Sequence, residues 1–297
     1  MTAPAIPIQR PVEARASRGL WGDAFRRLRR NRPAMVGVLI IVLFVFTALF
    51  APMIAPYSPL DGTLAGRLQP PSAEHIFGTD LQGRDEFSRV IYGAQVSLVA
   101  GISSVVMGVF IGGIIGALAG GLGGKVDAVL MRVVDVMLAI PGILLAIGIV
   151  AWLDRGLPQI MFAVAMVNVP IFARILRGSL LSLRESDYIT AARSLGASGW
   201  RILLRHMLPN SLTPLIVAAT LALATAIIDV AGLGFLGLGP PDPRTPEWGT
   251  MLTDSTKFLR QAFWLIFFPG TAIVITAVGF NLLGDGLRES LDPRMKR

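Results

Sequence analysis

The sequence predicts an all-α integral membrane protein with six transmembrane helices, from its composition, its charge-free runs and the placement of its basic residues. Of its 297 residues, 53% are hydrophobic and only 15% are charged, whereas a soluble domain has about 25% charged residues. A helix of about 20 apolar residues crosses a bilayer. Six runs without Asp, Glu, Lys or Arg reach or approach this length: 33–60, 90–124, 136–153, 156–173, 207–228 and 261–284.

The basic residues indicate the orientation of the helices. If the N-terminus is cytoplasmic, 20 of the 27 Lys and Arg residues fall in cytoplasmic segments and seven fall in outer loops. This is the positive-inside bias, which places both termini in the cytoplasm. The net charge of +8 then reflects topology, so no nucleic acid is expected as a partner. The basic N-terminal segment is expected to anchor the chain at anionic lipid of the bilayer.

These signals divide the chain into segments. Residues 1–32 are expected to form a cytoplasmic tail, 33–56 an uncleaved first transmembrane helix and 57–89 an external loop. Five more transmembrane helices are expected within 90–287, the third span covering about 126–152 and the fifth starting at Pro209. Residues 288–297 complete the chain as a second cytoplasmic tail.

Small residues recur every four positions along the second span. Ser104 and Gly124 bracket the four glycines that we expect to pack against a neighbouring helix, which are Gly108, Gly112, Gly116 and Gly120. Small residues four apart form a groove in which another backbone approaches closely. The spacing therefore predicts a helix-packing seam and indicates no chemistry.

The sequence lacks the motifs of an enzyme. The stretch 119–126 resembles a phosphate-binding loop, but Ala119 replaces its first glycine and Val126 replaces the Ser or Thr that holds magnesium. The chain has two His and no Cys, so a metal centre has almost no ligands available. We therefore expect that this chain binds no cofactor and that any ATP is hydrolysed by another chain.

A polar cytoplasmic segment, 185–208, separates the fourth and fifth spans. It is expected to form two short helices, because Ser186 or Asp187 can cap the first, Gly196 can end it in a left-handed conformation, and Ser198 can cap the second. One face of the first helix carries Tyr188, Ala191, Ala192 and Leu195. This face either lies flat on the membrane or inserts into a groove of a partner, and the residues alone leave both open.

This segment resembles the loop E-A-A-x3-G-x9-I-x-L-P of bacterial ABC importer permeases. The matching residues are Ala191, Ala192, Gly196, Leu208 and Pro209, while Thr190 replaces the Glu and His206 replaces the Ile. In that family the loop is a coupling helix that docks on the ATPase. The resemblance thus implies ATPase coupling through this segment, with Tyr188, Thr190 and Leu195 beside the matched residues.

Further stretches resemble the C-type permease subunit of dipeptide, oligopeptide and nickel importers: 77–89, 131–135 with Pro141, 234–239 through 246–249, and 281–288 with 291–293. The resemblance implies the type I permease fold in the bacterial cytoplasmic membrane. It also implies a second, B-type permease, two ATPase subunits or a heterodimer of them that hold ATP and magnesium, and an extracytoplasmic substrate-binding protein. Di- or oligopeptides are the expected substrates, with nickel, glutathione and short glycans as alternatives.

Two residues are candidates for the translocation pathway or its gate. Asp229 lies near the outer end of the fifth span, and Trp248 lies in the outer loop that follows. A charge inside the membrane usually faces a cavity or a partner, so Asp229 is either a coupling site for a proton or cation or an interfacial residue bonded to the backbone around Gly232 and Gly234.

An ion-coupled secondary transporter that uses Asp229 is the alternative from another class, although the sequence shows no internal repeat typical of such folds. Arg132 and Asp135 are three residues apart and are expected to form a structural pair.

Overall fold

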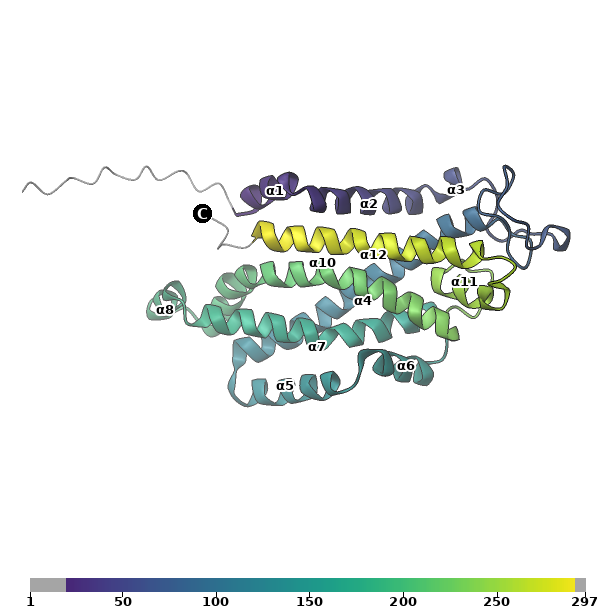
Figure 1. Cartoon of the computed structure of the whole chain (residues 1–297). Coiled ribbons are helices and arrows are strands. Elements are labelled where there is room, and N and C mark those ends of the chain that lie inside the picture. Colours follow the sequence, from purple (N-terminus) through teal and green to yellow (C-terminus); the bar gives the residue numbers. More distant parts are fainter. Residues whose placement is uncertain (1–19, 292–297) are drawn as a thin grey trace, which may run out of the picture.

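The computed structural model describes residues 20–291, which form an all-helical bundle (Figure 1). Five helices are long and apolar enough to cross a membrane, and a sixth span results if one sharply bent helix pair is counted as a single crossing. The long helices are α2 (Arg32–Leu49), α4 (Glu86–Leu122), α7 (Leu157–Arg184), α10 (Leu208–Leu233) and α12 (Trp264–Leu291). The bent pair is α5 (Gly124–Ala139) and α6 (Gly142–Leu153).

The third expected span is broken rather than continuous. Helices α5 and α6 meet at an angle of 96°, and Ile140 between them has an extended backbone with φ −94° and ψ 129°. Pro141 follows Ile140 and causes the break, because a proline disfavours helical geometry in the residue before it and has no N–H to donate. The span expected over about 126–152 is therefore a bent pair of helices.

Two other helix boundaries differ from expectation. Helix α4 begins at Glu86 rather than near Val90, because the Asp85 side chain accepts a hydrogen bond from the Ser88 N–H and caps it. Helix α10 does not restart at Pro209. The short helix α9 (Gly199–Ile202) continues through a π turn (Leu203–Met207) directly into α10.

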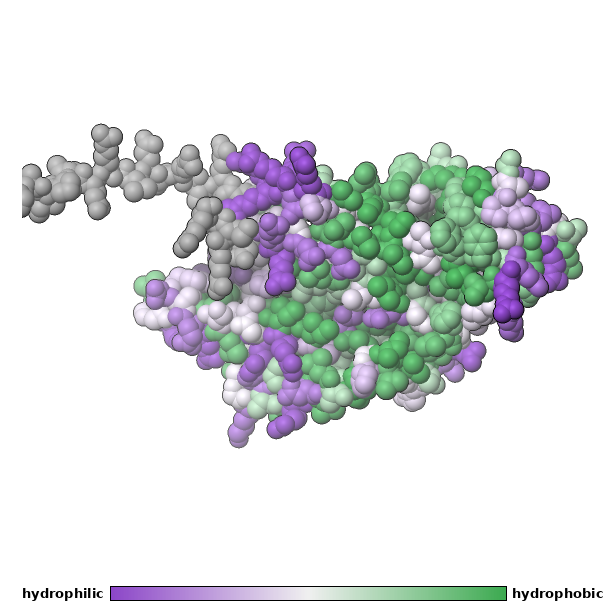
Figure 2. Space-filling view, in the orientation of Figure 1, coloured by the Kyte–Doolittle hydropathy of each residue, from purple (hydrophilic) through white to green (hydrophobic). Residues whose placement is uncertain are grey.

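Short elements lie at both ends of the bundle. Helices α1 (Leu20–Arg30) and α8 (Asp187–Ser194) lie at one end, and the last turn of α12 reaches the same end (Figure 1). At the opposite end lie α3 (Ala51–Ile54), the loop 55–85 with the turn Leu64–Gly66, and α11 (Trp248–Ser255) with the turns Gly234–Leu238 and Thr256–Phe258. A hydrophobic belt lies between these two hydrophilic ends (Figure 2). The arrangement is that of a multi-span membrane protein.

The four glycines of the second span lie against α7. A Cβ atom added at Gly112 would lie 2.5 Å from the Val169 carbonyl oxygen, and one added at Gly116 would lie 2.5 Å from the Ala173 carbonyl oxygen. Gly108 and Gly120 face the same helix, at Ala165 and Leu180. The backbones of α4 and α7 therefore approach each other as closely as glycine allows.

Ion pairs attach α5 to α7. Asp127 accepts hydrogen bonds from Arg177, with Nη2 at 2.6 Å from Oδ2. Asp135 pairs with Arg174 at 2.7 Å and not with Arg132, so the expected pair within one helix was wrong. In both pairs α7 supplies the arginine and α5 supplies the aspartate, so the two pairs join α5 to α7.

Candidate functional site

Helix α8 projects from one end of the bundle, beyond the hydrophobic belt (Figures 1 and 2). Ile189 attaches it to the rest of the protein, since its side chain is fully buried in the main hydrophobic core. On the outward side, Leu195 is 88% exposed and Tyr188 is 43% exposed. Ala191 is exposed beside them, whereas Ala192 is half-buried and packs against the core. The predicted apolar face is therefore mostly free in this chain.

A left-handed glycine ends α8. Gly196 has φ +80°, and its N–H donates to the Arg193 carbonyl while the Ala197 N–H donates to the Ala192 carbonyl at 3.1 Å. This pattern is a Schellman motif, in which glycine avoids the penalty that a Cβ incurs at positive φ. No atom lies within 4 Å of a Cβ added at Gly196, so conformation, and not crowding, requires glycine here.

The start of α8 differs from the expected cap. Ser186 occupies the N-cap position with an extended backbone, but its hydroxyl donates to the Leu183 carbonyl at 2.6 Å and caps no amide of α8. Ser198 likewise precedes α9 without a side-chain cap bond. Thr190 is exposed on α8, and its hydroxyl donates to the Ser186 carbonyl.

Leu208 and Pro209 lie in the first turn of α10 and not on the exposed face of α8. Sequence reasoning missed two exposed side chains nearby, Trp200 (55% exposed) and Leu204 (58% exposed). Their four-residue spacing on a helix was the available signal. With Tyr188 and Leu195 they give the segment 185–208 four large exposed apolar side chains.

Asp229 lines a cavity of about 70 Å³ together with Gly142, Ile143, Ala146, Val164 and Val167. The cavity adjoins the break between α5 and α6, where Gly142 and Ile143 begin α6. Among residues 20–291 the Asp229 carboxylate has no recorded hydrogen-bond partner, so the expected bonds to the backbone around Gly232 and Gly234 are not formed. The half-buried carboxylate and the broken span therefore share one small cavity whose other lining residues are apolar.

Trp248 is fully buried at the start of α11. Its Nε1 donates to the Val90 carbonyl at 3.0 Å, and its ring meets the Phe44 ring edge-on, with centroids 5.8 Å apart. A Cβ added at Gly93 would lie 2.6 Å from Trp248 Cδ1. Trp248 thus joins α2, α4 and α11 and borders no open space in this conformation; its role at a gate stays a prediction.

A buried charged network lies beside Trp248 and was not anticipated. Arg84 Nε donates to Asp80 at 2.6 Å, while Arg84 Nη1 donates to the Pro243 carbonyl at 3.1 Å. Arg89 Nη1 donates to the Pro59 carbonyl at 3.1 Å. The Arg84 bond to Pro243 fastens the loop 55–85 to the loop between α10 and α11, and the Arg89 bond to Pro59 fastens the same loop to the first turn of α4. The closely spaced charges of 80–89 were visible in the sequence, but their distant carbonyl partners were not.

The comparisons with known proteins agree with this architecture. Residues 112–297 match the model of the family described as "Binding-protein-dependent transport system inner membrane component". The chain belongs to this family. Residues 19–71 match a second model, described as the N-terminal TM domain of oligopeptide transport permease C.

Two curated relatives cover nearly the whole permease. The dipeptide transport system permease protein DppC of Alkalihalophilus pseudofirmus is 49% identical over 276 residues, which are 93% of this chain and 90% of that protein. The glutathione transport system permease protein GsiD of Escherichia coli is 46% identical over 293 residues, 98% of this chain and 95% of that protein.

Among solved structures, a chain of the MetNI methionine ABC transporter in an inward-facing conformation matches with a TM-score of 0.58 and 22% identity. The match covers 69% of this permease and 96% of that chain, and it shows the shared fold.

These findings confirm the predicted class of protein. The chain is a multi-pass inner-membrane permease component of an ABC importer, and it works in a complex with ATPase subunits instead of hydrolysing ATP itself. The resemblance to C-type permeases is confirmed by both the family models and the curated relatives.

Proposed function

We propose that this permease carries di- or oligopeptides through a pore that it shares with a second, B-type permease. Two ATPase subunits, or a heterodimer of them, hold ATP and magnesium, and an external substrate-binding protein delivers the peptide. The peptide class rests on DppC and GsiD, which are named for a dipeptide and for glutathione. Both are small molecules with amide bonds and charged ends, which favours peptides over nickel or glycans.

The exposed apolar face of α8 carries the mechanical part of the proposal. Leu195 and Tyr188 are exposed on α8, and this helix projects beyond the hydrophobic belt. An exposed apolar cluster in contact with water indicates a surface that binds a partner. Ile189 is fixed in the core on the other side of the same helix. A force applied to the exposed face by an ATPase is therefore transmitted to the membrane helices through a buried contact.

Closing of the ATPase dimer around ATP would move α8 and turn the membrane helices toward an outward-open state. The coupling requires that the ATPases bind one permease conformation better than the other. Asp229 and its cavity lie beside the bend of α5 and α6, and we place them on the pathway face of the permease. Family membership favours this mechanism over ion-coupled secondary transport, which would need no ATPase.

The test replaces Leu195, which is 88% exposed, with Asp. The Leu195→Asp variant should insert normally but lose ATPase co-purification and ATP-driven peptide uptake by about tenfold or more, because burying one Leu contributes about 1.5–3 kcal/mol. The matched control, Thr190→Glu, adds the same charge to the same helix at the position where the related loop carries Glu, and it should retain both. Normal uptake and co-purification for Leu195→Asp would exclude α8 as the coupling element.

A further inference from the structure

A basic cavity shares no lining residue with α8 or with the Asp229 cavity. It has a volume of about 620 Å³ and is formed by the end of α1, the start of α2 and the last turns of α12. Its lining residues are Arg27, Arg30, Asn31, Arg32, Pro33, Glu289 and Ser290. Helix α12 closes one side of it, since the Asn31 Nδ2 atom donates to the Glu289 carboxylate at 2.7 Å.

The cavity carries an excess of positive charge. Three arginines, Arg27, Arg30 and Arg32, line the cavity with one acidic residue, Glu289, whose carboxylate already accepts from Asn31. Within residues 20–291, none of these arginines forms an ion pair. A guanidinium presents a planar fork of donors that matches the oxygens of a phosphate. The chemistry of the cavity therefore fits a phosphate-bearing anion.

The surroundings indicate that this anion carries acyl chains. Helix α2 begins at Arg32, inside the cavity, and exposes Met35, Val36 and Leu39 within its first two turns. Figure 2 shows the hydrophilic end around α1 passing directly into the hydrophobic belt. An amphiphile bound here would place its headgroup among the arginines and its acyl chains along α2. A free anion would contact the arginines alone and leave the apolar side of α2 uncovered.

The position of the cavity agrees with the anionic surface of the inner leaflet. The cavity lies at the same end of the bundle as α8, and the positive-inside bias assigns that end to the cytoplasm. Anionic lipids there attract each nearby Lys or Arg. This attraction is either diffuse, as for any basic surface, or concentrated at one site such as this cavity.

We propose that the cavity binds the phosphate headgroup of one anionic phospholipid, with its acyl chains against the exposed side of α2. Arg27 and Arg30 come from α1 and Arg32 comes from α2, while Glu289 and Ser290 line the opposite wall from α12. The bound headgroup therefore joins the amphipathic helix α1 to the transmembrane bundle. Helix α1 gains a specific attachment in addition to its general attraction to the membrane surface.

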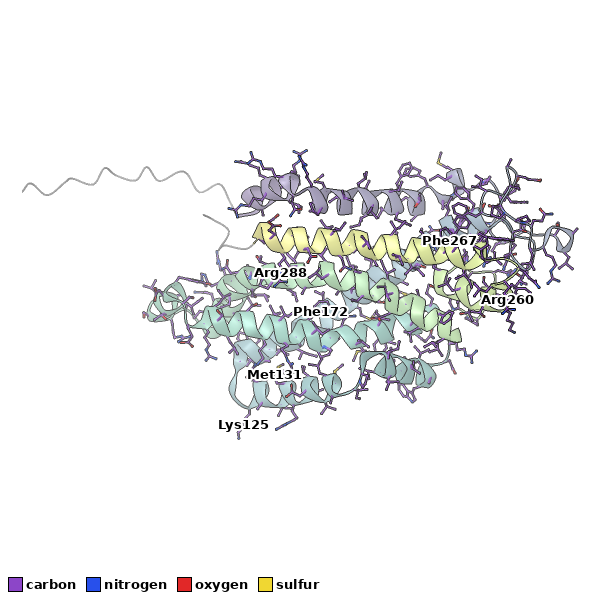
Figure 3. The ribbon with its side chains drawn as sticks, viewed as in Figure 1. Lys125, Met131, Phe172, Arg260, Phe267 and Arg288 are labelled. Atoms are coloured by element: carbon purple, nitrogen blue, oxygen red, sulfur yellow. The ribbon has the colours of Figure 1, made fainter. Side chains whose placement is uncertain are left out.

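The experiment titrates the purified full-length permease in mild detergent with phosphatidylglycerol or phosphatidylcholine and counts bound lipids by native mass spectrometry. We expect phosphatidylglycerol to bind at least tenfold more tightly than phosphatidylcholine. The double variant Arg27→Gln/Arg30→Gln should lose this preference. The matched control Lys125→Gln/Arg132→Gln removes the same charge from exposed positions of α5, across the bundle from the Arg288 region of α12 (Figure 3), and should keep it.

Three results would overturn the proposal. Equal loss of phosphatidylglycerol binding in both double variants would show diffuse attraction, and equal retention would show that the arginines of the cavity do not bind the lipid. Displacement of the lipid by millimolar inorganic phosphate would assign the cavity to a free anion. Unchanged thermal unfolding and phosphatidylcholine binding in both variants serve as the check that neither substitution disturbs the fold.

Discussion

Glu247 shows how a single buried carboxylate organises the outer end of the permease. It precedes α11 and accepts hydrogen bonds from the backbone N–H groups of Gly249 at 2.9 Å and Thr250 at 2.8 Å. Burial raises the pKa of the Glu247 carboxyl from 4.5 to about 7, although these hydrogen bonds oppose the shift. One side chain thus combines a helix cap, which favours the ionised form, with a buried site, which disfavours it.

Glu247 should make the stability of the permease depend on pH. Because its pKa is higher in the folded state, the folded state binds more protons than the unfolded state between pH 4.5 and about 7. This stabilising contribution is complete below pH 4.5 and is lost as the pH rises through about 7. The thermal unfolding midpoint should therefore fall less steeply from pH 5 to 8 in Glu247→Gln than in wild type. Parallel profiles would contradict the assignment.

Residues differ in how far their roles could be predicted. The left-handed conformation of Gly196 was predictable, because a helix followed by glycine is a local signal. The partner of Asp135 was not, since Arg174 lies 39 positions away on another helix and spacing along the chain does not report such contacts. The buried state of Trp248 also depends on α2 and α4, which no local pattern places beside it.

At the scale of elements, the apolar runs identified every span. The hydropathy averaged over a run does not show where the helix within it is broken. Pro141 lies inside the charge-free run 136–153, and hydropathy alone treats that run as one helix. The opposite error occurs at Pro209. The proline suggested that a new helix starts there, but the π turn Leu203–Met207 joins α9 to α10 without a break. Local backbone geometry decides both cases, and hydrophobicity does not report it.

The α4–α7 seam gives a sharp test at this scale. Gly112→Ala should destabilise the permease by about 1–3 kcal/mol, because the added methyl group meets the Val169 backbone, which cannot rotate away. The neighbouring control Gly113→Ala meets only a Leu176 methyl group at 4.0 Å, so it should be neutral or slightly stabilising through helix propensity. Thermal unfolding in detergent measures both. A Gly112→Ala variant as stable as Gly113→Ala would show that α4 and α7 do not pack this closely.

At the scale of the whole molecule, polarity and charge define two different ends. One end holds α8, the basic cavity and the start of α1, while the other holds the folded loop 55–85 and α11 (Figure 1). Six crossings, with α5 and α6 counted as one, return the chain to the end where it began. ATPase coupling through α8 and lipid binding in the basic cavity both require these two features to be cytoplasmic. Peptide delivery by an external binding protein requires the loop 55–85 to be external.

Single-cysteine labelling tests this orientation directly, because the natural chain contains no Cys. Ala73 and Ser198 are both exposed and lie at opposite ends, in the loop 55–85 and before α9. In intact cells, Ala73→Cys should react with a membrane-impermeant maleimide, whereas Ser198→Cys should react only after the membrane is permeabilised. The permeabilised sample is the control for reactivity, and both variants should label fully in it. Labelling from outside of Ser198→Cys but not of Ala73→Cys would invert the bundle, moving α8 away from the ATPases and the basic cavity away from the inner leaflet. Labelling of both variants from outside would mean an even number of crossings between them, α4 and α7, with the bent pair α5 and α6 entering and leaving on the same side.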